Sequence, residues 1–207
     1  MKIPLVLTRS PGQTQPFLPN GSNMFHVEQN IIVQIVALLL KRDSHPRKLA
    51  KDLGVSHTTV LRKLRGLLDG NVVDFRIEGK NTVYFLKKTL EARLYSYVAE
   101  WYALGNLIEE APHLRPVVRT IQERGDIQLA VLFGSYAKGT ADKKSDIDVY
   151  IETDDREVKR ELERSHLRLS VKIGSWDPEN LLIQEIAKNH VILKGVERYY
   201  ERTKFFE

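Results

Sequence analysis

The stretch LFGSYAKGTADKKSDIDVYIE, from Leu132 to Glu152, constrains the fold more than any other part of the chain. An apolar strand-like run comes first, a Gly-Ser pair follows it, and a second strand-like run carries two aspartates separated by one isoleucine. Residues two apart in a strand face the same side of a sheet, so Asp146 and Asp148 are expected to project side by side. The predicted order is strand, glycine turn, polar loop and strand.

Two carboxylates held side by side repel each other unless a cation lies between them. Aspartate oxygens suit Mg²⁺ or Mn²⁺, which also bind phosphate oxygens and water. Gly134 and Ser135 directly follow a strand and open a predicted helix, where free backbone N–H groups and a hydroxyl can hold phosphate. We therefore predict Asp146 and Asp148 as metal-binding and catalytic residues, and Gly134 and Ser135 as nucleotide-binding residues. The alternative is that both aspartates are surface turn residues.

The combination of strand, GSYAKGT, polar loop and SDIDVYIE resembles the DNA polymerase beta-like nucleotidyltransferase superfamily, specifically its minimal archaeal and bacterial members. The resemblance covers about Leu129 to Lys194 and implies an α/β fold with a small mixed sheet. It also implies transfer of a nucleoside monophosphate from a nucleoside triphosphate to a hydroxyl, with Mg²⁺ or Mn²⁺. Lys144 and Ser145, which directly precede the aspartate pair, are further candidates for nucleotide binding.

Minimal transferases of this family often modify a partner protein or act as antitoxins. The resemblance therefore extends to the acceptor, which would be a protein hydroxyl, for example on a toxin partner, or a small molecule. The sequence does not distinguish between these acceptors.

The sequence departs from the family pattern at one position. The family supplies a third carboxylate from a later strand, and the matching run Leu167–Ile173 carries Lys172 where that acid is expected. A protonated ammonium has no lone pair for a metal. Lys172 is instead predicted to hold the triphosphate or to pair with an aspartate, unless the strand alignment is shifted by two residues. Asp177, next to Pro178, is predicted to be the N-cap of the following helix.

A second pattern lies in the first half of the chain, in LAKDLGVSHTTVLRKLRGLLDGNVV. This stretch and the residues that flank it predict helices over 29–41, 47–53 and about 56–69, with Ser56 as an N-cap of the third. They also predict a β-hairpin formed by 72–77 and 82–86. Apolar residues on one side of the third helix leave short polar groups and arginines on the other, which suits the major groove. The predicted DNA-binding residues are Ser56, His57, Thr58, Arg62 and Arg65 on this helix, and Arg76 and Lys80 in the hairpin.

This half resembles the winged helix-turn-helix family of bacterial and archaeal transcription regulators, over roughly Gln29 to Leu86. The family implies binding to double-stranded DNA, usually as a dimer. Residues 26–88 hold 12 basic and 6 acidic residues, a net charge of +6, which favours a polyanionic partner. A winged helix that serves only as a protein-interaction module stays an alternative, because fold alone does not fix the ligand.

These patterns divide the chain of 207 residues into four segments. Residues 1–25 are predicted to be disordered, 26–88 to form the winged helix-turn-helix, 89–125 a helical connector, and 126–207 the nucleotidyltransferase domain. The fold class is α/β (α+β). Trp101, Tyr102 and their aromatic neighbours are expected to form a helix-packing or dimer face, which includes a homodimer among the expected partners.

Composition narrows the setting. The absence of cysteine excludes disulfides and thiolate metal sites. The longest apolar run, IIVQIVALLL, is too short to cross a bilayer, so no membrane partner and a cytoplasmic location are expected.

The leading hypothesis from the sequence is a DNA-binding protein whose second domain binds a nucleoside triphosphate with Mg²⁺ and transfers a nucleotidyl group. One alternative is a transcriptional regulator whose transferase domain senses nucleotide without catalysis. Another is a transferase that modifies nucleic acid ends held by the winged helix.

Overall fold

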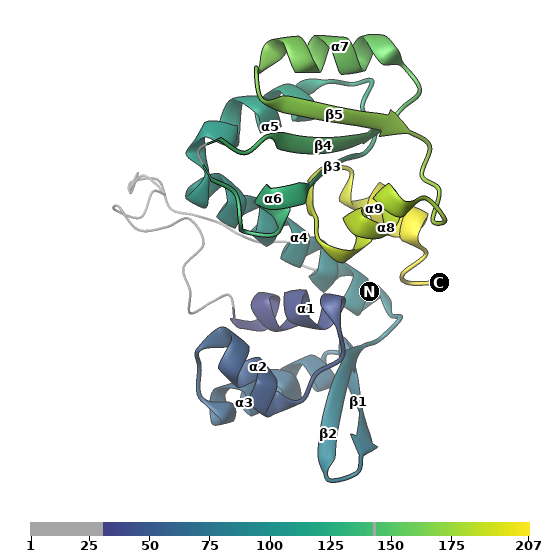
Figure 1. Cartoon of the computed structure of the whole chain (residues 1–207). Helices are drawn as coiled ribbons and strands as arrows, with labels where there is room; N and C mark the ends of the chain where they lie inside the picture. The colour runs from purple at the N-terminus through teal and green to yellow at the C-terminus, as the bar shows by residue number, and fades with distance from the viewer. Residues whose placement is uncertain (1–30, 143) are drawn as a thin grey trace, which may run out of the picture.

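The structure of the chain is a computed structural model that describes residues 31–142 and 144–207 (Figure 1). The predicted disordered segment 1–25 lies outside these residues. A two-stranded sheet belongs to the first half and a four-stranded mixed sheet to the second, which confirms the predicted fold class. Within the described ranges, no helix is long and apolar enough to cross a membrane.

The first half has the predicted winged helix-turn-helix order, close to the predicted bounds. Its elements are α1 (Ile31–Lys41), α2 (Pro46–Leu53), α3 (His57–Asp69), β1 (Val73–Glu78) and β2 (Asn81–Leu86). Ser56 caps α3 as predicted, because its Oγ accepts a hydrogen bond of 3.1 Å from the backbone N–H of Thr59. The buried side chains of α3 are Val60, Leu64 and Leu67, which pack against α1 and α2 and leave the opposite side of α3 exposed.

The connector is mainly one long helix, α4 (Leu90–Glu110), followed by a 3₁₀ turn, η2 (Pro112–Leu114), and α5 (Arg115–Glu123). The hydroxyl of Thr89 caps the first turn of α4, and Pro112 follows its end. Figure 1 shows α4 running from the winged helix to the back of the four-stranded sheet.

The second half alternates strands and helices. In chain order these are β3 (Ala130–Phe133), α6 (Gly134–Ala137), β4 (Ile147–Glu152), α7 (Arg156–Ser165), β5 (Leu169–Gly174), α8 (Leu181–Lys188), β6 (Val191–Lys194) and α9 (Val196–Thr203). The sheet order is β5-β4-β3-β6, with β4 and β5 parallel and the other neighbours antiparallel.

Two local predictions need correction. The strand expected from Asp146 begins at Ile147, so Asp146 lies at the end of the preceding loop. The N-cap of α8 is Asn180 and not Asp177. Asp177 accepts a hydrogen bond from the backbone N–H of Glu179, which places it in the turn before the helix, and Asn180 Oδ1 then accepts from Leu182.

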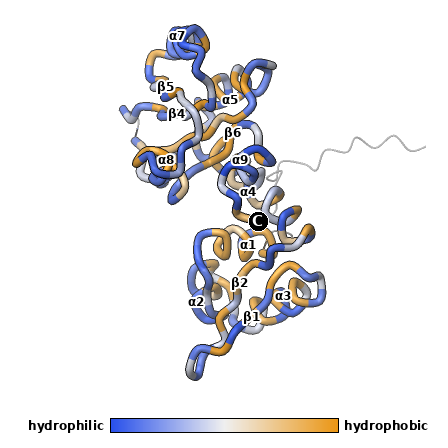
Figure 2. Tube along the Cα trace, turned by 90° about the vertical axis from the view of Figure 1, so that its right-hand side faces the viewer, coloured by the Kyte–Doolittle hydropathy of each residue, from blue (hydrophilic) through white to orange (hydrophobic). Residues whose placement is uncertain are grey.

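Buried apolar side chains form two clusters, one on each face of the four-stranded sheet. The first fills the face under α5 and α7 and includes the end of α4. The second, which we call the junction core, runs from the opposite face through α4 and α9 into the winged helix. Figure 2 shows hydrophobic residues gathered on the inner strands and the inner sides of the helices. The junction core is therefore shared by the two halves, and α4 packs into it between them.

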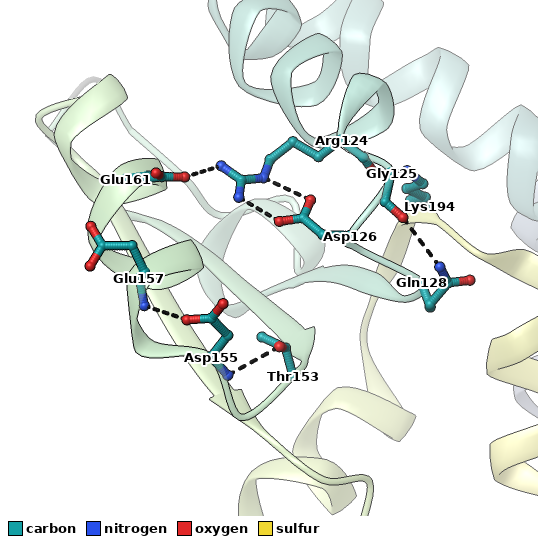
Figure 3. A network of polar contacts seen from close by, with 9 residues as sticks. All are labelled: Arg124, Gly125, Asp126, Gln128, Thr153, Asp155, Glu157, Glu161 and Lys194. Carbon is teal, nitrogen blue, oxygen red and sulfur yellow. Dashed lines mark hydrogen bonds and ion pairs between the residues drawn. The ribbon is translucent and has the colours of Figure 1, made fainter.

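A polar network surrounds Arg124 in the loop that precedes β3 (Figure 3). The Arg124 guanidinium donates to Asp126 at 2.6 and 3.0 Å and to Glu161 of α7 at 2.6 Å. Lys194 of β6 donates to the carbonyl of Arg124. These four residues, called the Arg124 network below, tie α7 and β6 to the loop that precedes β3.

Candidate functional site

The glycine turn and the aspartate strand meet at the end of β3. Phe133, the last residue of β3, pairs with Asp148 of β4 in the antiparallel ladder. Gly134 then turns the chain into α6 with φ +70°, a conformation that L side chains rarely adopt. A Cβ at this position would also overlap the Asp148 carboxylate at Oδ2. Glycine is required here because the acid packs directly against the first residue of the turn.

The environment of Asp148 makes its charged form less favourable than that of a free aspartate. Partial burial is the largest effect and raises the pKa of its carboxyl above the ordinary value, and the nearby Asp146 and Glu185 raise it further. A hydrogen bond from Ser170 and the charge of Lys172 act in the opposite direction. Asp146 is exposed and Asp148 is partly buried. The pair therefore lies near the surface, where β4 begins.

The register of β5 shows what stands in place of a third acid. In this register Ser170 pairs with Asp148, and Lys172 pairs with Tyr150. Lys172 is two residues after Ser170 on β5, so both side chains lie on the same face of the sheet. Lys172 is exposed and influences Asp148 electrostatically, but within 31–142 and 144–207 it forms no ion pair. The sequence analysis missed Ser170, which holds the lateral position beside Asp148, because that assignment depends on the strand register.

Two further charged residues border this corner. Lys138, just after α6, donates to Glu185 of α8 at 2.6 Å, and this contact lowers the pKa of the Glu185 carboxyl. The sequence analysis did not identify either residue. They are 47 positions apart, and only the packing of α8 beside β3 brings them together.

Lys144 and Ser145, predicted to bind nucleotide, belong to a turn built around Asp142. Asp142 accepts from the backbone N–H of Lys144 at 2.7 Å and from the Ser145 hydroxyl at 3.1 Å. These bonds lower the pKa of the Asp142 carboxyl. The turn is next to Asp146 in the chain, but the Ser145 hydroxyl is already engaged.

The donor set fits a metal ion that arrives with a nucleotide. Asp146 and Asp148 offer hard oxygen ligands, and neither forms an ion pair with another described residue. No group of three or more His, Asp or Glu side chains in the described ranges is placed to hold a metal by itself. Mg²⁺ commonly takes one or two carboxylates and completes its shell with substrate phosphates and water. Asp146 and Asp148 would therefore supply the protein ligands to a nucleotide-bound Mg²⁺ or Mn²⁺.

The predicted DNA-binding residues of α3 share one exposed face. His57, Thr58, Arg62 and Arg65 are exposed, as is Leu61 between them. The side chains of Arg62 and Arg65 form no ion pair in the described part of the chain. Their charges are therefore available to an external anion.

The hairpin residues differ from each other. Arg76 donates to Asp43 at 2.6 Å and to Glu78 at 2.7 Å, and the hydrogen bond to Asp43 is the first cause of its raised pKa. Lys80 lies in the exposed turn at the hairpin tip. Of the two, Lys80 is the freer candidate for contact with phosphate.

Comparison with known families finds a separate family model for each half of the chain. The model of the family described as Polymerase beta, Nucleotidyltransferase matches residues 116–198, and the model described as Helix-turn-helix domain matches residues 32–66. The chain is thus a fusion of a DNA-binding-type module and a transferase-type module. Residues 116–198 are a nucleotidyltransferase domain of the polymerase beta family, and residues 32–66 are a helix-turn-helix domain. A comparison with curated proteins found no match.

Several solved structures resemble parts of the chain. The transcriptional repressor BigR from Xylella fastidiosa is 19% identical, with 36% of this chain and 73% of that chain covered, at a TM-score of 0.34. The adhesin competence repressor AdcR from Streptococcus pyogenes is also 19% identical, with coverages of 42% and 66% and a TM-score of 0.37. ZitR from Lactococcus lactis, solved in complex with DNA, is 15% identical, with coverages of 52% and 73% and a TM-score of 0.36.

Proposed function

We propose that this chain binds duplex DNA through its winged helix and binds a nucleoside triphosphate with Mg²⁺ in its transferase domain, from which it transfers a nucleotidyl group to a hydroxyl acceptor. The observation that carries the proposal is the packing of Gly134 against Asp148, with Asp146 two residues before it and no ion pair from either acid to another described residue. The family match to the transferase domain agrees with this assignment.

Each part of the corner has a separate task in this proposal. The backbone N–H groups that follow the glycine turn, with the Ser135 hydroxyl, bind phosphate oxygens. Asp146 and Asp148 hold the cation that accompanies the triphosphate, and bound Mg²⁺ supplies charge neutralisation on the reacting phosphate. Lys172, on the same face of the sheet, is placed to attract the anionic triphosphate chain. The acceptor is a hydroxyl of a partner protein, for example a toxin, or of a small molecule.

The direct experiment follows radiolabel from α-³²P-labelled ATP, CTP, GTP and UTP into protein or small-molecule acceptors of a cell extract, with Mg²⁺ present. The wild-type chain is compared with the Asp146→Asn/Asp148→Asn variant. We expect Mg²⁺-dependent labelling that the variant loses by on the order of 100-fold or more, because substitutions outside the metal's direct ligands already cost 10–100-fold. Asp142→Asn is the matched control, since Asp142 only shapes the loop turn.

A second candidate function has a specific observation in its favour. Ser170 and Lys172 occupy the β5 positions beside the acid pair, so the third carboxylate that serves as general base in the family has no counterpart on this strand. In this alternative the transferase domain binds the nucleotide and reports on it to the winged helix without transferring it. Tight Mg²⁺-dependent nucleotide binding combined with no labelled acceptor would favour the sensor.

Acid substitutions on β5 separate the two functions further. Lys172→Asp and Ser170→Asp each place a carboxylate on the face that carries Asp148. If catalysis is limited by the missing base, one of them should raise the transfer rate by about tenfold or more, in the range of a positioned general base. Ser170→Asn is the uncharged control, and an unchanged rate in both acid variants would argue against a missing base.

We further propose that the DNA-binding form is a homodimer. Leu90, Leu94, Val98 and Trp101 recur at helical spacing on α4, and 44–66% of each side chain is exposed. A second copy would bury this stripe and present two α3 helices to two half-sites, as DNA recognition by paired helices requires. Leu94→Glu/Trp101→Glu should shift the mass measured by multi-angle light scattering from dimer to monomer, whereas the exposed Glu109→Lys should not.

A further inference from the structure

The strand beside the acid pair carries a cation where a third acid would lie. Ser170 of β5 pairs with Asp148 of β4, and Lys172 follows two residues later, so both β5 side chains lie on the face that carries Asp148. The side chain of Lys172 is exposed and forms no ion pair with a residue that the structure describes. Its positive charge acts to lower the pKa of the Asp148 carboxyl, whereas burial and Asp146 raise it.

The other acids in this part of the sheet are already engaged. Glu185 binds Lys138 at 2.6 Å. Glu152, further along β4, binds Arg198 at 2.9 Å. Asp142 accepts hydrogen bonds within its own turn. In the part of the chain that the structure describes, no third carboxylate joins the acid pair in a group that could hold a metal ion.

Charge balance then decides how many divalent cations the corner can hold. In sites with two metal ions, the ions lie about 4 Å apart. Their mutual repulsion is strong at that distance unless several anionic ligands surround them. Two carboxylates with phosphate oxygens and water are a complete ligand set for one Mg²⁺. A second divalent cation here would have no carboxylate of its own and would face the ammonium of Lys172.

We propose that the corner binds a nucleoside triphosphate with one divalent cation, and that the ammonium of Lys172 takes the place of a second. Asp146 and Asp148 hold the cation, and Lys172 donates hydrogen bonds to phosphate oxygens of the same nucleotide. Lysine suits this task because its ammonium is a compact point charge on a flexible stem. The inference rests on the proposed nucleotide binding and holds whether the nucleotidyl group is transferred or only sensed.

The first test counts metal ions in the full chain by electron paramagnetic resonance of Mn²⁺. The chain is mixed with an equal amount of the α,β-methylene analogue of ATP, CTP, GTP or UTP, which cannot transfer a nucleotidyl group. The loss of the free Mn²⁺ signal gives the number of ions bound. We expect one Mn²⁺ per bound nucleotide, with the spectrum of an isolated ion.

Two other results have different meanings. Two Mn²⁺ per nucleotide in the wild-type chain, with the exchange-coupled spectrum of ions about 4 Å apart, would overturn this inference and leave the proposed function standing. No nucleotide-dependent binding of Mn²⁺ with any of the four analogues would contradict both.

Acid substitutions on β5 test whether Lys172 occupies the position of a second cation. Lys172→Asp and Ser170→Asp each supply a carboxylate on the face of Asp148. At least one of these variants should bind a second Mn²⁺ and show the exchange-coupled spectrum. A single uncoupled Mn²⁺ in both variants would contradict the assignment of this position.

A neutral substitution tests the charge of Lys172 directly. Lys172→Gln should still bind one Mn²⁺, while the Kd for the nucleotide analogue rises about tenfold, because a charged hydrogen bond to phosphate is lost. Lys188→Gln is the matched control. It removes the same charge from an exposed position at the end of α8 and should leave the Kd nearly unchanged. Wild-type nucleotide affinity in Lys172→Gln would overturn the role of Lys172.

Discussion

The Arg124 network and the Asp146–Asp148 pair both gather carboxylates around the same four-stranded sheet, but their charges are balanced differently. In the network, Asp126 receives two hydrogen bonds from Arg124, and these lower the pKa of its carboxyl below the ordinary value. In the pair, burial and a neighbouring acid raise the pKa of Asp148. The acids of the network are paired with Arg124, whereas Asp146 and Asp148 form no ion pair with the residues that the structure describes.

Whether a charged side chain has an ion-pair partner within the chain indicates its role better than its residue type does. Charges balanced inside the chain fix one element to another, whereas an unbalanced charge held by rigid packing favours an external partner. The same contrast exists among the basic residues. Arg76 and Arg124 are each bound by two carboxylates, while Arg62 and Arg65 face solvent without an ion pair in the described ranges.

The largest effects are expected at two glycines, Gly195 and Gly134. Substitution of the first should affect stability alone, and substitution of the second should also affect nucleotide binding. In Gly195→Ala, the new Cβ would overlap the backbone carbonyl of Gln128 at φ +81°, and backbone cannot easily move away. We expect a loss of more than about 3 kcal/mol in the free energy of unfolding, measured by urea denaturation.

Gly134→Ala meets the movable Asp148 carboxylate instead of backbone. We expect a smaller loss of about 1–2 kcal/mol for the left-handed conformation, together with about 100-fold weaker Mg²⁺-dependent nucleotide binding as the carboxylate is displaced. Unchanged nucleotide affinity in this variant would show that the packing of Gly134 on Asp148 serves the fold alone.

The next effect concerns DNA. Arg62→Ala/Arg65→Ala should weaken binding to duplex DNA and lower the slope of log affinity against log salt by about 2, if each arginine meets one phosphate. Fluorescence anisotropy at several salt concentrations measures both quantities. Arg76→Ala is the matched control and should change the slope less, because Asp43 and Glu78 already bind its guanidinium.

A smaller effect is expected in the network. Arg124→Met keeps much of the side chain's length and leaves Asp126 and Glu161 without their cation. We expect a loss of about 1 kcal/mol in unfolding free energy, since these ion pairs are partly exposed. Nucleotide and DNA affinities should not change, and a large loss of either would contradict a purely structural role.

The smallest effect is pH-dependent. The pKa of Asp126 is lower in the folded chain than its unfolded value of about 3.9, so its stabilisation is present above that value and is lost as the pH falls through the folded pKa. Asp126→Asn should therefore be less stable than wild type by under about 1 kcal/mol at pH 7, with the difference disappearing towards pH 2. A difference that persists at pH 2 would mean that packing, not charge, explains the loss.

The sequence predicted those features that depend on local chemistry. The cap at Ser56 and the turn at Gly134 follow from residues close together in the chain, and the structure has both. The order of elements in both halves was also predictable, because each strand and helix has its own period of apolar residues.

Features that depend on tertiary register or packing were not predictable. Ser170 beside Asp148 follows from the alignment of β5 with β4, and the contact of Lys138 with Glu185 follows from the position of α8. The N-cap of α8 was predicted wrongly because Asp177 and Asn180 are both good capping residues, and only the turn geometry chooses between them.

The most direct measurement is a crystal structure of the chain with a non-hydrolysable nucleoside triphosphate and Mn²⁺, in which anomalous scattering locates the metal. Asp146 and Asp148 should then coordinate a Mn²⁺ that also binds the triphosphate, with phosphate oxygens at the backbone of Gly134 and Ser135. A nucleotide bound elsewhere, or one bound at the corner with neither aspartate touching the metal, would contradict the account.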